Sequence, residues 1–235
     1  MKIRLDRMLS HMGIGSRTEV KKYLKMCRVK VNGNFEKNFS RQVDTEKDEI
    51  LFDGHKVLYK EFTYIMLNKP KGCISATFDS KLKTVLDLLL IPYSNMELFP
   101  VGRLDIDTTG FLILTNDGKF SYNVTSPKKK VNKKYFVKLL KNLTDDQKEK
   151  LENGIYFEKE DFTTESAKVE EISEKEIHLT ISEGKFHQVK RMLEYVGNEV
   201  IELKRVKIGN LSLDDNLKLG EYRELTKEEI EKIFE

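Results

Sequence analysis

The stretch Pro100-Val101-Gly102-Arg103-Leu104-Asp105-Ile106-Asp107-Thr108-Thr109-Gly110 stands directly before five apolar or β-branched residues, Phe111-Leu112-Ile113-Leu114-Thr115. The second run predicts a buried strand. The first run contains an arginine and two carboxylates between two glycines. Because it precedes a buried strand, we expect it to be a loop at the edge of the core, where a rigid scaffold can present side chains to a ligand. Asp105 is the candidate for the central chemical group, because a carboxylate acts as a nucleophile or a general base without a cofactor.

Two other interpretations of these carboxylates stand beside the catalytic one. An aspartate before Thr-Thr-Gly favours a turn, because its side chain accepts bonds from backbone N–H groups two residues on, so Asp105 and Asp107 also fit a structural role. The spacing Asp105-x-Asp107-x-Thr109 matches the first half of a calcium loop. The twelfth position of that loop is Asn116 instead of Glu, and the second half is the predicted strand, so calcium is disfavoured.

Composition bounds the class of protein. The 235 residues are 34% charged and 39% hydrophobic, which suits a globular chain of one large domain or of a small and a medium one. No apolar run approaches the ~20 residues of a membrane span, and the start has no apolar signal-peptide core. Cys27 and Cys73 lie too far apart in sequence to suggest a disulfide framework or a metal-ligand pair. We therefore expect a cytoplasmic protein with no metal.

The charge is unevenly distributed along the chain. The net charge is +3, but residues 1–60 hold 14 Lys and Arg against 8 Asp and Glu, a balance of +6, so the remainder carries −3. Two short helices are predicted. The first has apolar residues at helical spacing over 3–12, and the second begins with a capping box from Ser16 to Glu19 and continues with the same apolar spacing. Asn32-Gly33 and Asp53-Gly54 predict hairpin turns. The outer faces of the helices carry the candidate RNA-binding residues Arg4, Arg7, Arg17, Lys21, Lys22, Lys25 and Arg28. Such a face would bind RNA mainly through phosphates.

Beyond a hinge at Lys60-Glu61-Phe62 the pattern predicts a second domain. Strands are expected at 63–67, 111–115, 134–140, 167–172, 176–182 and 199–206, and helices at 144–152, 187–196 and 226–234. The first and last of these helices start with capping boxes, at Thr144 and Thr226. Turns or short helices join most of the strands, which favours an α+β domain with a mixed, largely antiparallel sheet over a doubly wound one. A second basic patch lies at 126–141, where seven lysines and no acid surround Tyr135. Tyr135 is either a stacking residue or a good strand former.

The segment Gly102–Gly110 resembles the catalytic motif of the RsuA-type pseudouridine synthases, which isomerise a uridine within ribosomal RNA to its C-glycoside. The resemblance continues, in the family's order and across nearly the whole chain, through Leu67-Asn68-Lys69-Pro70-Lys71-Gly72, Lys134-Tyr135, Glu183-Gly184-Lys185-Phe186-His187-Gln188-Val189-Lys190-Arg191-Met192 and Gly220-Glu221-Tyr222-Arg223-Glu224-Leu225-Thr226. It implies an S4-like RNA-binding domain at 1–60, a pseudouridine synthase catalytic domain at 62–235, and no cofactor.

The resemblance also implies roles for individual residues. Asp105 would be the essential carboxylate, Tyr135 would contact the target base, and Lys190 would pair with Asp105 and favour its charged form. Arg103 would fill the gap left by the flipped base. Apart from the resemblance, Lys128, Lys129 and Lys130 of the second basic patch are further candidate RNA-binding residues. His187 is better explained as a hydrogen-bonded structural residue than as a ligand or base.

The partner implied by the resemblance is ribosomal RNA, either free or in an assembly intermediate of the small subunit. We expect the protein to act as a monomer and not to bind a membrane. Within the family the resemblance favours uridine 516 of the small-subunit (16S) RNA as the target. A large-subunit (23S) uridine is the alternative substrate. A non-catalytic RNA-binding assembly protein is the alternative class, and the presence of Asp105, Tyr135 and Lys190 argues against it.

Overall fold

The computed structural model describes all 235 residues except the side chain of Lys159, and it divides the chain into two compact units. Unit 1 comprises Met1–Thr63 with Leu86–Phe99, and unit 2 comprises Tyr64–Val85 with Pro100–Glu235. The segment Leu86–Phe99 lies in the range that the sequence analysis assigned to the second domain. It joins unit 1 because Asn95 Nδ2 donates to the carbonyl of Gly13 at 3.0 Å, and because Gly13 lacks the Cβ that would lie 2.1 Å from the Pro92 oxygen.

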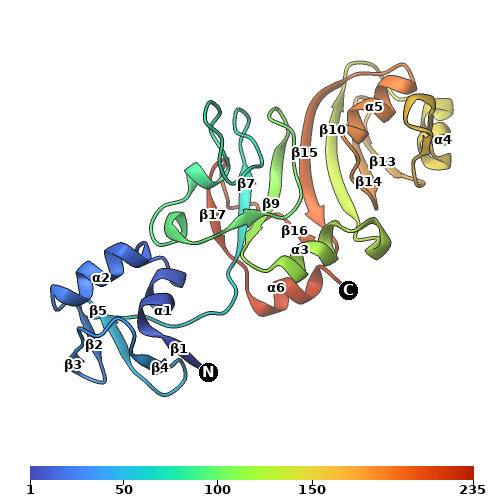
Figure 1. Ribbon diagram of the computed structural model, residues 1–235. Coiled ribbons are helices and arrows are strands. Elements are labelled where there is room, and N and C mark those ends of the chain that lie inside the picture. Colours follow the sequence, from blue (N-terminus) through green and yellow to red (C-terminus); the bar gives the residue numbers. More distant parts are fainter. The chain divides into compact units, whose positions relative to one another are not determined.

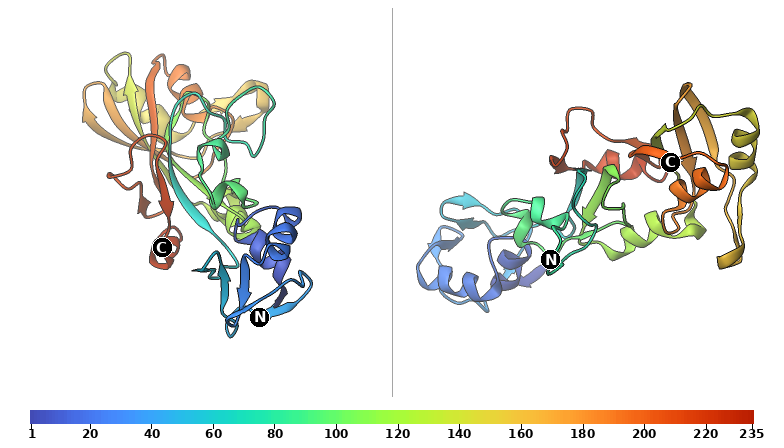
Figure 2. Two further views of the ribbon diagram at one scale, coloured as in Figure 1. Left: turned by 90° about the vertical axis from the view of Figure 1, so that its left-hand side faces the viewer. Right: turned by 90° about the horizontal axis from the view of Figure 1, so that it is seen from above.

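Unit 1 contains the two predicted helices, α1 (Leu5–His11) and α2 (Arg17–Lys25), which lie side by side next to its strands (Figures 1 and 2). The capping box at the start of α2 is confirmed. Asn32 and Gly33 take positive φ angles of 51° and 82°, as the predicted hairpin turn requires. The strands are β1 (Lys2–Arg4) paired with β4 (Gln42–Asp44), and a sheet of order β3 (Asn34–Phe35), β2 (Val29–Val31), β5 (Ile50–Phe52) and β6 (His55–Lys56).

Unit 2 is built on one sheet, and its strand order is β13-β14-β10-β15-β9-β7-β17 (Figure 1). The bounds are β7 (Tyr64–Lys69), β9 (Thr109–Thr115), β10 (Lys133–Leu139), β13 (Lys168–Ser173), β14 (Glu176–Ile181), β15 (Val200–Ile208) and β17 (Tyr222–Glu224), with β8 (Phe99–Pro100) beside β9 and β16 (Leu211–Ser212) beside β15. A small separate pair joins β11 (Tyr156–Phe157) to β12 (Phe162–Thr163). Neighbours run antiparallel except β15 and β9, so the predicted mixed, largely antiparallel α+β sheet is confirmed.

The helices of unit 2 include the three that the sequence predicts and one that it missed. The predicted ones are α4 (Asp145–Asn153), α5 (Gln188–Tyr195) and α6 (Lys227–Lys232), and both predicted capping boxes are present. The missed helix is α3 (Gly118–Thr125), where the Asp117 side chain accepts from the Phe120 N–H. Short 3₁₀ turns cover Leu86–Leu88, Tyr93–Asn95, Pro127–Lys129 and Glu158–Glu160. No helix in the described residues has the length and apolarity to cross a membrane.

The strand β9, which follows the central loop, lies in the core of unit 2. All seven residues of β9 are buried, and Phe111 and Ile113 pack with Phe120 and Val124 of α3 in one hydrophobic cluster. Four aliphatic or aromatic side chains of this kind each contribute ~1.5 to 3 kcal/mol when fully removed from water. The loop that precedes β9 is therefore attached directly to the best-packed strand of unit 2.

Candidate active site

The loop that carries Asp105 ends at a point of close backbone contact. Gly110 pairs with Arg205 in the parallel register of β9 and β15, and a Cβ at Gly110 would lie 2.3 Å from the Arg205 carbonyl oxygen. Its φ of 101° is also one that residues with a side chain rarely adopt. The second glycine of the central motif is therefore needed where β9 meets β15, which determines where the loop leaves the sheet.

The side chain of Lys69 anchors the loop from beneath. Lys69 is fully buried at the end of β7, and its ammonium donates to the carbonyls of Asp105 at 2.9 Å and Thr108 at 3.0 Å, and to that of Pro70 at 3.1 Å. Burial lowers the pKa of Lys69, and nearby carboxylates oppose that effect. Gly72 N–H also donates to the Ile106 carbonyl at 2.8 Å. Three carbonyls of the loop are thus hydrogen-bonded to the end of β7 and to the turn that follows it.

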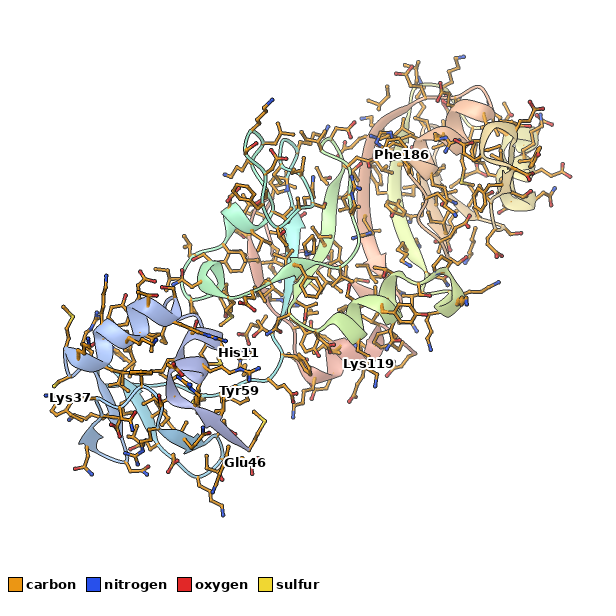
Figure 3. The ribbon with its side chains drawn as sticks, in the orientation of Figure 1. His11, Lys37, Glu46, Tyr59, Lys119 and Phe186 are labelled. Atoms are coloured by element: carbon orange, nitrogen blue, oxygen red, sulfur yellow. The ribbon has the colours of Figure 1, made fainter. Side chains whose placement is uncertain are left out.

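Replacing Lys69 by methionine tests this anchoring. We expect Lys69→Met to fold but to lose ~10- to 100-fold in turnover, because the loop carbonyls lose their donor and a displacement of about 1 Å at the chemistry costs that much. Turnover and thermal unfolding are measured together. Lys119→Met, the same change at an exposed position of α3 (Figure 3), is the matched control. Full turnover in Lys69→Met would contradict the anchoring role.

Two side chains, those of Lys190 and His187, lie next to the carboxylate of Asp105. Lys190 Nζ, on α5, lies 2.6 Å from Asp107 Oδ1 and 3.4 Å from Asp105 Oδ2. His187 Nε2 lies 3.4 Å from Asp105 Oδ1. The structure thus brings Lys190 to Asp105 as the sequence predicts, but the short hydrogen bond goes to Asp107. That hydrogen bond and the charge of Lys190 hold the pKa of Asp107 below its usual range, against the opposing effect of burial.

His187, which the sequence indicates to be a hydrogen-bonded structural residue, lies beside Asp105. His187 precedes the first turn of α5 with a positive φ of 49°, a conformation that residues other than glycine seldom adopt. Its ring stacks on Phe186 at 3.8 Å between centroids, and Phe186 is 70% exposed (Figure 3). The strand-to-helix turn therefore places an imidazole against Asp105 and an aromatic ring in solvent beside it.

A pocket of about 120 Å³ is lined by three of the predicted site residues. Asp105, Arg103 and Tyr135 line it, and Tyr135 projects from β10 with only 8% of its surface exposed. Asp105 itself retains 27% exposure of its side chain, so a ligand in the pocket can reach it. Lys128, Lys129 and Lys130 lie outside the pocket in and after a 3₁₀ turn, and Lys130 forms an exposed ion pair with Glu165 at 3.4 Å. The structure therefore assembles the predicted catalytic residues and separates this lysine run from them.

The same pocket contains three buried charged residues that the sequence analysis did not single out. Lys133 and Arg205 are 8% and 4% exposed, and Glu183 is 5% exposed. Glu183 Oε1 accepts from Gln188 Nε2 at 2.6 Å and from the Glu165 N–H at 2.9 Å. In the sequence, Lys133 is one of seven lysines in the second basic patch, and Arg205 lies inside a predicted strand. The sequence feature that could have identified them is the alternation of side chains along a strand, which places both cations on the buried face of the sheet.

The comparisons with known proteins fit this site. The family model for RNA pseudouridylate synthase matches residues 63–195, which include Asp105, Tyr135 and Lys190. The chain belongs to the RNA pseudouridylate synthase family. The predicted enzyme class and the predicted resemblance are thereby confirmed.

Relatives of this pseudouridine synthase match over nearly their whole length. An uncharacterized RNA pseudouridine synthase of Bacillus subtilis, YtzG, is 47% identical over 97% of each chain. The ribosomal small subunit pseudouridine synthase A of Haemophilus influenzae is 39% identical over 98% of this chain and 99% of its own, and that of Escherichia coli is 40% identical over 97% and 98%. A crystal structure of a pseudouridylate synthase aligns with a TM-score of 0.70 at 39% identity, covering 98% and 99% of the two chains.

Proposed function

We propose that this pseudouridine synthase isomerises uridine 516 of small-subunit ribosomal RNA, with Asp105 as the essential carboxylate. The observation that carries the proposal is the placement of Asp105 in a pocket beside Tyr135 and within 3.4 Å of Lys190. The target is supported by relatives at 39% and 40% identity that are named ribosomal small subunit pseudouridine synthase A. The protein acts as a monomer in the cytoplasm, on free RNA or on an assembly intermediate.

The reaction needs a base that has left the stack. Tyr135 stacks on the extruded uracil, and the exposed Arg103 fills the space that the base vacates. The C1′–N1 bond breaks with both electrons going to the base. Asp105 either attacks C1′ or takes the C2′ proton and later returns it. The base rotates, C5 bonds to C1′, the C5 proton is lost and N1 is protonated. Substrate and product are isomers, so the balance requires neither an oxidant nor a cofactor.

Mapping pseudouridine in ribosomal RNA from a strain that lacks this protein tests the proposal. We expect one pseudouridine, at position 516 of the small-subunit RNA, to disappear and to return when the wild-type protein is supplied. Loss at a large-subunit position would support the alternative substrate. No loss anywhere, together with defective subunit assembly, would support a non-catalytic assembly protein. Supplying Asp105→Asn in the same strain shows whether the carboxylate is required.

Unit 1 is proposed to be an S4-like domain that binds the RNA backbone. Arg17, Lys21 and Lys25 are exposed and recur every four residues along α2, so they share one face. Not every predicted cation is equally available. Arg4 pairs with Asp6 at 2.8 Å and Arg28 pairs with Asp53, so their charges are partly compensated within the unit. Among the described residues Arg7, Arg17, Lys22 and Lys25 make no such ion pair.

Neutralising the shared face of α2 tests the RNA-binding role. Deleting residues 1–60 would also strip the partners of Leu86–Phe99, so the sharper variant is Arg17→Gln, Lys21→Gln and Lys25→Gln combined. We expect weaker RNA binding and a log–log salt slope reduced by ~0.7 to 0.9 for each phosphate that the variant no longer neutralises. The control changes Lys218, Lys227 and Lys232 of unit 2 to glutamine. Equal salt slopes in the α2 variant and the wild-type protein would show that this face is only solvated surface.

A further inference from the structure

Among the residues that the structure describes, no carboxylate pairs with Arg205 or Lys133, two buried cations that line the active-site pocket. Arg205 Nε donates to the Phe111 carbonyl at 2.7 Å, but its Nη2 is buried without a hydrogen-bond partner. Lys133 Nζ donates to the Val124 carbonyl at 3.0 Å. No ion pair joins either cation to a carboxylate within the part of the chain that the structure describes. Burying unpaired charge is costly, so this arrangement needs a compensating anion.

The two cations also act on one another. Burial, with the charge of Arg205 as a second cause, lowers the pKa of Lys133 to about 8. The carboxylates that line the same pocket are Asp105 and Glu183. Asp105 is held by Lys190 and His187, and Glu183 accepts from Gln188 and a backbone N–H. The pocket therefore presents positive charge that its own acids do not neutralise.

The sheet places both cations beside the tyrosine. Lys133 precedes Tyr135 by two residues in β10, and both are buried on the same face of that strand. Arg205 is the cross-strand partner of Tyr135 on β15. A base stacked on Tyr135 would thus have Lys133 and Arg205 near its edges, whereas the phosphates remain outside with the RNA backbone. The position favours the base over a phosphate as the anion.

We propose that Lys133 and Arg205 are catalytic residues that hold the detached uracil as an anion, an inference that rests on the proposed function. When the C1′–N1 bond breaks, the base takes both electrons and spreads the charge over N1 and its two carbonyl oxygens. Uridine is neutral, so its attraction to the two cations becomes strongest as negative charge develops on the leaving base. The cations therefore stabilise the transition state more than the bound substrate, which lowers the barrier to breaking the C1′–N1 bond. The anion is neutralised when C5 bonds to C1′, the C5 proton leaves and N1 is protonated.

Changing the leaving group tests the proposal. Single-turnover cleavage of the C1′–N1 bond is followed at saturating RNA carrying either uridine or 5-fluorouridine, at mildly acidic pH so that N3 of both bases stays protonated. The fluorinated base is the more stable anion and needs less help to leave. Lys133→Met should lose on the order of 100-fold on uridine, the cost of one oxyanion donor, and clearly less on 5-fluorouridine. Lys133→Arg keeps the charge and should retain more of the rate.

The controls separate this role from others. Lys207→Met makes the same change on β15 at a residue that does not line the pocket, and its loss, if any, should be equal on both bases. Turnover of the wild-type protein on uridine RNA is measured first. If the wild-type protein shows no turnover, the proposed function is wrong, and the variants are not needed to show it. If Lys133→Met slows the cleavage of both bases by the same factor, the proposal is overturned. It is also overturned if the variant loses only RNA affinity, because that result would indicate a phosphate contact.

Two further measurements keep the test decisive if Lys133→Met does not fold. Arg205→Met is compared on the same two bases and should show the same inequality. In the wild-type protein, the rate of the chemical step on uridine should fall as pH rises through about 8, because Lys133 then loses its charge. The charged and titratable groups that line the pocket with it include Arg205, Tyr135, Asp105 and Glu183. A flat profile between pH 7 and 9 would overturn the proposal.

Discussion

Asp105→Asn should abolish pseudouridine formation while leaving RNA affinity nearly unchanged. The amide has the size and shape of the carboxylate, but it neither attacks C1′ nor takes a proton from C2′. The backbone carbonyl of residue 105 still accepts from Lys69, so the loop should keep its place. Removing an essential nucleophile or base costs at least ~10⁴-fold in turnover. Pseudouridine yield and RNA binding are measured side by side on the same preparation.

The neighbouring carboxylate provides the matched comparison. Asp107 is 62% exposed and bonds Lys190 at 2.6 Å, so Asp107→Asn should reduce turnover far less than Asp105→Asn. A loss of RNA binding as large as the loss of turnover in Asp105→Asn would point to a folding defect. Near wild-type turnover in Asp105→Asn would show that the chemistry does not run through this carboxylate.

Lys190→Met is the second variant from which we expect a large effect. Lys190 holds the pKa of Asp107 down, so its removal raises that pKa and leaves two adjacent carboxylates without their cation. Losing a cation disfavours the charged form of a carboxylate that it contacts, so activity that depends on the carboxylates of this loop should be lost at a higher pH than before. We expect the acid limb of the pH–rate profile to move to higher pH and turnover to fall by ~10- to 100-fold.

Lys190→Arg and the RNA concentration separate this role from phosphate binding. The arginine retains the charge, so this variant should keep more activity although the guanidinium is larger and planar. If Lys190 instead contacts a phosphate, Lys190→Met weakens binding, reduces the salt slope and leaves the acid limb in place at saturating RNA. An unmoved acid limb under those conditions would assign Lys190 to the RNA backbone.

Local patterns in the sequence were sufficient for most elements and for the centre of the site. Capping boxes at Ser16, Thr144 and Thr226 predicted the starts of α2, α4 and α6, because a cap is formed by residues three apart. The apolar run 111–115 predicted β9, and the acidic loop before it predicted Asp105. The missed helix α3 shows the limit of such patterns, since eight residues with two buried side chains give a weak periodic signal.

The sequence by itself determined the family motifs, the α+β class, and Asp105, Tyr135 and Lys190 as the residues to test. Only the tertiary structure showed that Lys69 donates to a carbonyl 36 residues away, that Lys190 bonds Asp107 more closely than Asp105, and that Arg205 lies across from Tyr135. The physical reason is range. Helix periodicity and capping depend on neighbours within about four residues, whereas a buried charge is explained only by partners that the sheet brings together from distant strands.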